Sequence, residues 1–136
     1  MTLEELNHYS SGSNQVIESF GILSCLNTSC RIEKYGPLQH LKVHRDACVR
    51  VSGQRESYTV YAIVIYLNDG YTGGYTRFCD KVDPHPKDGK FPYSFIDVKG
   101  NMGDALVFRH EILHKGGVVE KGMKYILRLD AAYRLL

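Results

Sequence analysis

Apolar and polar residues alternate in short runs along most of the chain, and turn-forming residues separate these runs. The longest run, Ser57–Leu67 (SYTVYAIVIYL), is rich in β-branched and aromatic residues. It is apolar at both sets of alternating positions, which predicts a strand buried on both of its faces. Shorter strands are expected at Arg31–Tyr35, Leu41–His44, Gly73–Phe78, Ser94–Val98, Ala105–Phe108 and Lys124–Ala131.

Helical patterns occur only near the N-terminus, at Leu3–Tyr9 and Asn14–Phe20. Many short strands with Gly and Pro between them, and no helices in the connections, favour a jelly roll over a parallel α/β fold. A chain of 136 residues has room for one domain. We therefore predict a mainly β single domain over residues 1–136, a double-stranded β-helix (jelly roll) with short N-terminal helices. Residues 1–30 form a helical or loop brace and residues 31–136 form the core.

Composition narrows the range of partners. The net charge is +2 with both signs interspersed, so no basic stripe indicates nucleic acid. No apolar run is long enough to cross a membrane, and the polar, acidic N-terminus does not read as a signal peptide. The four cysteines form no C-x-x-C pair. We expect a cytoplasmic protein with reduced thiols, no membrane partner and no nucleic-acid partner.

Residues 109–117, RHEILHKGG, contain the pattern H-E-x-x-H at His110, Glu111 and His114. On a helix, this pattern is the zinc site of a metallopeptidase. The preceding GDALVF reads as a strand, however, and Gly116 and Gly117 would break a helix within a turn of His114. A zinc peptidase is therefore the remote alternative for this sequence.

A second metal pattern lies earlier in the chain, at His44-Arg45-Asp46. Residues i and i+2 of a strand point to the same side, so one imidazole and one carboxylate could share an ion. A third ligand from another strand would complete the facial triad of non-haem Fe(II) oxygenases, which leaves open positions for a cosubstrate and O₂.

Four motifs then follow in order, and together they cover about Arg31 to Tyr133. They are YGPLQHLKVHRD, YLNDGYTGGYTRF, GDALVF and HKGGVVEKGMKYILRLD. In these motifs the sequence resembles the prolyl 4-hydroxylase-like group of Fe(II)/2-oxoglutarate dioxygenases. The N-terminal part is short for that group and two of the usual glycines before H-x-D are replaced. A thinly covered sheet face is a candidate for self-association, so a homodimer is one hypothesis.

The resemblance implies Fe(II) ligands at His44, Asp46 and His114, with no metal role for His110. It implies a 2-oxoglutarate-dependent dioxygenase that hydroxylates or otherwise oxidises an unactivated C–H bond and releases succinate and CO₂. Ascorbate is a hypothetical additional reductant. The alternative from another class is a jelly-roll module that binds a metal or ligand without turnover.

The resemblance also assigns the distal carboxylate of 2-oxoglutarate to Lys124, with the hydroxyls of Tyr35 and Tyr66 beside it. Lys124 and Arg128 fall on one face of the last strand, so Arg128 is a second contact or a substitute.

Substrate choice is expected to lie in the loops Arg45–Tyr58 and Phe78–Ser94, with His40 and Arg45 as rim candidates. A peptide, a prolyl residue or a small molecule would fit these loops, and prolyl is the substrate by analogy only.

Overall fold

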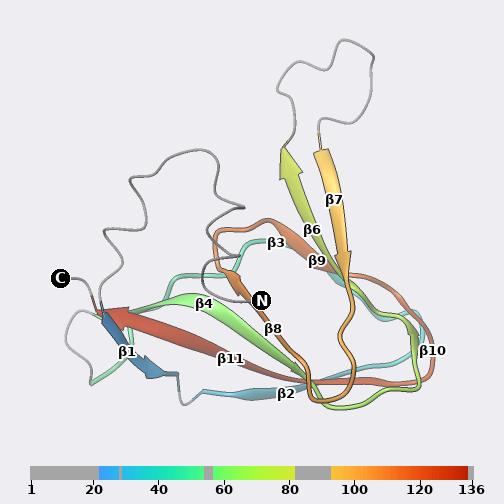
Figure 1. The fold of residues 1–136 in the computed structure, drawn as a ribbon, viewed down its shortest axis with the longest axis horizontal. Coiled ribbons are helices and arrows are strands. Elements are labelled where there is room, and N and C mark those ends of the chain that lie inside the picture. The colour runs from blue at the N-terminus through green and yellow to red at the C-terminus, as the bar shows by residue number, and fades with distance from the viewer. Residues whose placement is uncertain (1–21, 28, 54–56, 82–92, 135–136) are drawn as a thin grey trace, which may run out of the picture.

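The computed structural model of the chain describes residues 22–27, 29–53, 57–81 and 93–134 (Figure 1). The regular elements within these ranges are all strands, in two antiparallel sheets and one short pair. The two helices predicted at Leu3–Tyr9 and Asn14–Phe20 lie outside the described residues. No helix among the described residues is long and apolar enough to cross a membrane.

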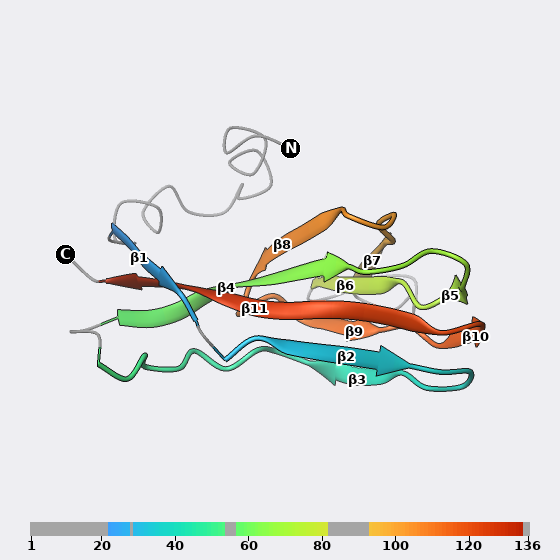
Figure 2. The same ribbon diagram turned by 90° about the horizontal axis from the view of Figure 1, so that it is seen from below.

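The larger sheet is built around the last strand of the chain. Its strand order is β1-β11-β4-β8, and β2 also pairs with β11. β1 and β2 pair with successive stretches of β11, so they lie along the same edge of it (Figure 2). The strands of this sheet are β1 (Ile22–Leu26), β2 (Arg31–Tyr35), β4 (Ser57–Tyr66), β8 (Ala105–Arg109) and β11 (Lys124–Arg134).

The smaller sheet has the strand order β3-β9-β6-β7, and the pair β10-β5 closes the end of the fold. Figure 1 shows β6 and β7 projecting together from the body of the domain. Side chains of the two sheets meet between the layers, for example where the rings of Phe78 and Phe108 pack 5.1 Å apart. This arrangement confirms the predicted jelly roll. The remaining strands are β3 (Leu41–His44), β5 (Thr72–Gly73), β6 (Thr76–Lys81), β7 (Tyr93–Val98), β9 (His114–Gly116) and β10 (Val119–Lys121).

Several strand boundaries differ from the sequence prediction. β1, β9 and β10 were not predicted, and the expected strand Gly73–Phe78 is divided into β5 and β6. The division falls at Gly73 and Gly74, whose φ angles of 69° and 65° interrupt an extended strand. β1 lies inside the stretch expected as a helical or loop brace, and it pairs with the C-terminal part of β11.

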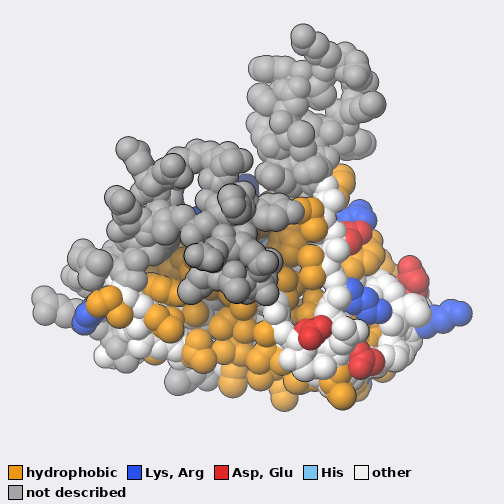
Figure 3. Space-filling model, viewed as in Figure 1, with side chains coloured by type: hydrophobic (Ala, Val, Ile, Leu, Met, Phe, Trp, Pro, Cys, Tyr) orange, Lys and Arg blue, Asp and Glu red, His pale blue; other side chains and the backbone are white. Residues whose placement is uncertain are grey.

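The expectation that Ser57–Leu67 is buried on both faces is wrong. Ala62, Val64 and Tyr66 on one face of β4 are buried, whereas Ile63 and Ile65 on the other face are only half-buried. The strand sits in an antiparallel sheet with one face in the core, which explains the difference. In Figure 3, hydrophobic side chains gather over the region of β4 and β11. Self-association of this face remains a prediction.

The buried core lies between the sheets. Cross-strand pairing places Ala62 beside Phe108 and Tyr66 beside Ile126, so residues of one face stack in rows. The same face of β11 carries Lys124, Ile126 and Arg128, all buried. The core therefore continues directly into a row of charged side chains.

Candidate metal centre and cosubstrate pocket

His44 and His114 face each other across the antiparallel pair β3–β9. Their ring centroids are 4.3 Å apart. In each residue Nδ1 lies 2.8 Å from a backbone carbonyl two positions earlier, that of Lys42 or Ile112. A carbonyl only accepts, so both Nδ1 atoms carry the proton and both Nε2 atoms keep a lone pair. The two Nε2 atoms are therefore prepared to bind a metal ion.

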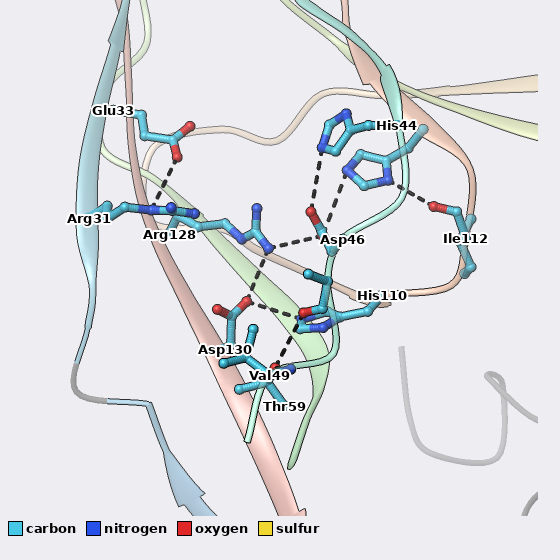
Figure 4. Close-up of polar contacts among 12 residues, drawn as sticks. Arg31, Glu33, His44, Asp46, Val49, Thr59, His110, Ile112, Arg128 and Asp130 are labelled. Carbon is cyan, nitrogen blue, oxygen red and sulfur yellow. Dashed lines mark hydrogen bonds and ion pairs between the residues drawn. The ribbon is translucent and has the colours of Figure 1, made fainter. Parts of the chain in front are cut away.

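Asp46 comes from a segment that has left the sheet. β3 ends at His44, so strand alternation alone does not fix the Asp46 side chain as the sequence analysis assumed. Its backbone N–H donates to the carbonyl of His110 at 2.9 Å. Further along, the N–H of Val49 donates to the hydroxyl of Thr59, and the N–H of Thr59 donates to the carbonyl of Val49 (Figure 4). These bonds hold the irregular segment against β4 and β8.

The structure brings the three candidate ligands together. Their ligand atoms all lie within 4.8 Å of one another. Asp46 Oδ1 is 3.4 Å from His44 Nε2, and Oδ2 is 3.8 Å from His114 Nε2. Asp46 Oδ2 is buried and makes no hydrogen bond of good geometry, although the Arg128 guanidinium lies 2.9 Å away. Its remaining lone pairs can also ligate a cation. Burial lowers the pKa of His114, which keeps its imidazole in the neutral form that ligates metals.

Two imidazoles and one carboxylate are the donor set of non-haem Fe(II) sites, and His114 of this group also lines a pocket. The residues present therefore fit a divalent iron ion.

The H-E-x-x-H pattern is a turn between β8 and β9, so it lacks the helix that a zinc peptidase needs. His114 belongs to the triad, whereas Nε2 of His110 lies 3.1 Å from Asp130 Oδ1. The Glu111 side chain is exposed, and its carboxylate pairs with Arg109 at 2.9 Å. The two histidines of the pattern therefore serve different partners.

Lys124 marks the other end of the pocket. It is 4% exposed, and its Nζ donates to the carbonyl of Gly74 at 2.6 Å. The rings of Tyr35 and Tyr66 lie 5.8 and 5.6 Å from Nζ. Burial lowers the pKa of Lys124 to about 8, although Glu33 partly counteracts it. A buried ammonium in this state would gain strongly from a ligand carboxylate.

The two predicted tyrosines differ in how free their hydroxyls are. The Tyr35 hydroxyl donates to Glu33 at 2.6 Å, and burial together with this bond raises its pKa. The Tyr66 hydroxyl is buried and makes no hydrogen bond of good geometry among the described residues. Burial raises its pKa, although Thr76 and the backbone of Gly100 partly counteract this. Glu33 also lines the pocket, and no motif in the sequence marks it. The alternation of Glu33 and Tyr35 along β2 was the available signal.

Arg128 lies at the metal end of the row, away from the Lys124 end. Its Nη2 is 2.9 Å from Asp46 Oδ2 and 3.0 Å from Asp130 Oδ1 (Figure 4). Burial would raise the pKa of Asp130, but the hydrogen bond with His110 and the charge of Arg128 outweigh it and lower this pKa. Asp130 was missed in the sequence, although its spacing of two from Arg128 puts it on the same strand face.

One open pocket joins the two ends of the site. Its empty space of about 500 Å³ includes a part that is open to solvent, and its lining includes His114, Tyr35, Lys124 and Arg128. The two rim candidates lie on the exposed surface near β3: His40 precedes the strand, and Arg45 follows it. Arg45 Nε donates to the carbonyl of Glu111 at 3.0 Å, which ties the rim to the turn before His114.

This fold and donor set are those of a jelly-roll protein with a candidate metal site and, beside it, a pocket lined by the buried cation Lys124. The family model of the 2OG-Fe(II) oxygenase superfamily matches residues 30–129, and the chain belongs to this family. The family uses Fe(II) and 2-oxoglutarate, and the His44, Asp46 and His114 group is consistent with the metal.

Similar solved structures agree on the fold. An oxidoreductase of the 2OG-Fe(II) oxygenase family from Burkholderia pseudomallei is 18% identical, with a TM-score of 0.55; the match covers 77% of this chain and 41% of that protein. A Pseudomonas putida prolyl-4-hydroxylase is 22% identical, with a TM-score of 0.54; the match covers 82% of this chain and 53% of that protein. AviO1 from Streptomyces viridochromogenes Tue57 is 19% identical, with a TM-score of 0.53; the match covers 79% of this chain and 49% of that protein. The chain thus spans about half the length of these proteins. No curated protein matches the sequence significantly.

Proposed function

We propose that this chain is an Fe(II)- and 2-oxoglutarate-dependent dioxygenase that oxidises an unactivated C–H bond and releases succinate and CO₂. The observation that carries the proposal is the pocket, which is lined both by the metal-site residue His114 and by the buried cation Lys124. A dicarboxylate with a chelating keto-acid end needs both features in one cavity. Iron and cosubstrate supply the oxygen activation and the two electrons of the decarboxylation.

The chain supplies the geometry. His44, Asp46 and His114 would hold the ion from one side through two nitrogens and one oxygen, which leaves positions open for the cosubstrate. Both imidazoles are already held in the required tautomer by their Nδ1 bonds. Ligand binding at this centre therefore costs little reorganisation.

At the other end, Lys124 would pair with the distal carboxylate. The ammonium is fixed by Gly74 and lies over two tyrosine rings, so the pair would form in a site that excludes water. Tyr66 would add a hydroxyl donor, since its hydroxyl makes no hydrogen bond of good geometry among the described residues. Tyr35 would first have to release Glu33. Arg128 is engaged with Asp46 and Asp130, which favours Lys124 over Arg128 for this role.

A peptide or prolyl residue and small molecules are the proposed substrates, bound near the rim residues His40 and Arg45. The prolyl option rests on analogy with the Pseudomonas putida protein, to which 22% identity shows a likeness of fold alone. Iron-loaded enzyme should be incubated with peptide and metabolite pools under O₂, and products with a gain of one oxygen mass should be sought.

The test of the activity itself is succinate formed from 2-oxoglutarate in the presence of that substrate. Succinate must depend on iron and O₂, and it must be lost in Asp46→Ala. A protein that binds Fe(II) and 2-oxoglutarate but makes no succinate with any pool would instead be a binding module, and the proposal would be rejected.

A further inference from the structure

Arg128 places a cation directly beside a candidate metal ligand. Its Nη2 lies 2.9 Å from Asp46 Oδ2, and both side chains are largely buried, at 11% and 7% exposure. Charges at this separation interact strongly where water is excluded. A guanidinium in this position competes with a divalent ion for the carboxylate. The metal site therefore needs a device that weakens this competition.

Asp130 offers Arg128 a second anion on the opposite side. The same Nη2 atom is 3.0 Å from Asp130 Oδ1, nearly the same distance as to Asp46 (Figure 4). Without Asp130, Arg128 would have Asp46 as its remaining ion-pair partner among the described residues. Its guanidinium would then compete more strongly with a divalent ion for that carboxylate.

His110 fixes Asp130 in this position. Its Nε2 lies 3.1 Å from Asp130 Oδ1, and its own backbone N–H donates to the carbonyl of Val60 at 2.8 Å. Its carbonyl accepts the backbone N–H of Asp46. His110 therefore contacts both the backbone of the candidate ligand Asp46 and the Asp130 carboxylate that pairs with Arg128.

We propose that Asp130, anchored by His110, is a positioning residue that retains Arg128 when a metal ion binds, so that Asp46 keeps its negative charge for the ion. This inference rests on the metal site proposed above. It predicts that the effect of removing Asp130 depends on whether Arg128 is present, which a purely structural role of Asp130 would not produce.

Co(II) titration of the full chain, followed by visible absorption, tests the proposal without turnover. Asp130→Asn should weaken Co(II) binding by about tenfold or more, as changes to residues that support metal ligands commonly do. Arg128→Met should bind Co(II) at least as tightly as the wild type. The double variant should recover to within about threefold of Arg128→Met, because the competing cation is gone. An equal loss in both backgrounds, or no loss in Asp130→Asn, would overturn the proposal.

Two further measurements separate folding and site failures from failure of this inference. His110→Leu should weaken Co(II) binding, whereas His110→Gln keeps a donor for Asp130 and should bind close to the wild type. Equal Co(II) binding by these two variants would contradict the role of His110 in anchoring Asp130. If Asp130→Asn unfolds below the titration temperature, the comparison of the two His110 variants tests the proposal instead. Asp46→Ala should lose Co(II) altogether. Unchanged binding in Asp46→Ala would reject the proposed metal site itself.

Discussion

The Nζ atom of Lys124 lies 2.6 Å from the carbonyl oxygen of Gly74, deep in the pocket and 4% exposed. None of the ion pairs found among the described residues includes Lys124. The desolvation cost of the ammonium is offset by one neutral acceptor, two tyrosine rings and the charge of Glu33, and not by a directly paired carboxylate. Such a residue is unfavourable for the isolated fold and useful to a ligand anion.

Lys124→Met should consequently have opposite effects on 2-oxoglutarate binding, which it should weaken, and on the stability of the ligand-free protein, which it should increase. We expect 2-oxoglutarate affinity of the Co(II)-loaded protein to fall by about 100-fold or more, the usual cost of removing one partner of a buried charge pair. The melting temperature of the ligand-free protein should rise by a few degrees, because a buried charge is removed and its apolar stem is kept. Calorimetric titration and thermal unfolding measure the two effects. A lower melting temperature together with unchanged affinity would show that Lys124 is a structural cation instead.

The affinity for 2-oxoglutarate should also depend on pH. Burial places the pKa of Lys124 near 8 in the free protein, and a bound carboxylate would raise it, since it stabilises the charged form. Between the two pKa values the binding must take up a proton, so Kd rises as pH increases, by about tenfold per unit at most. Below pH 8 the ammonium is already charged and Kd should be nearly flat.

The matched control for this experiment is Lys124→Arg, whose guanidinium stays charged through the same range. Whatever the absolute affinity of this variant, its Kd for 2-oxoglutarate should stay nearly constant between about pH 7.5 and 9.5 and lack the rise expected for the lysine. An identical slope in both proteins would assign the titration to another group.

Linear spacing on the last strand was enough to predict that Lys124 and Arg128 share one face of β11. The ligand prediction rested on the H-x-D pattern and on the family resemblance, because His114 lies on a short strand that the spacing did not reveal. The partner of Arg128 could not be found in this way. Asp46 reaches Arg128 from an irregular segment distant in sequence, and its position depends on bonds to His110 and Thr59 rather than on any local pattern.

The short strands β9 and β10 were missed for a related reason. Each has three residues and adjoins glycines, so local propensity says little. β9 becomes a strand because β3 and β6 pair with it on its two sides. The burial of the outer face of β4 was predicted wrongly, because an apolar sequence does not show whether another layer packs against it. Sequence thus predicted the architecture and which residues meet at the candidate metal centre, but not the contacts that hold them there.

The Gly73-Gly74 turn should be as important for the cosubstrate as for the fold. Gly74 has a φ of 65°, and a Cβ there would lie 3.2 Å from Tyr71 and Val119 and 3.3 Å from Cδ of Lys124. Gly74→Ala should lower the free energy of unfolding by about 1–2 kcal/mol and also weaken 2-oxoglutarate binding. Denaturant unfolding and ligand titration measure these effects.

Gly70→Ala is the matched control for the crowding term. Gly70 has a similar φ of 81°, but nothing lies within 4 Å of a Cβ placed there. It should lose stability from backbone strain alone and keep 2-oxoglutarate affinity. If both alanine variants reduce ligand affinity equally, displacement of Lys124 is not the cause.

The two histidines of RHEILHKGG should respond differently to removal, because they face different partners. His114→Ala removes a candidate ligand whose Nε2 faces Asp46, so stoichiometric Fe(II) or Co(II) binding should be lost. His110→Ala should keep one metal site per chain, at lower affinity, because its side chain reaches Asp130 and not the triad. Glu111→Gln should leave succinate production within about twofold, since its exposed carboxylate pairs with Arg109 at the surface. Metal content after anaerobic loading and succinate yield decide among these outcomes. Loss of activity in Glu111→Gln, together with full metal retention in His114→Ala, would point back to an H-E-x-x-H centre, which the turn between β8 and β9 argues against.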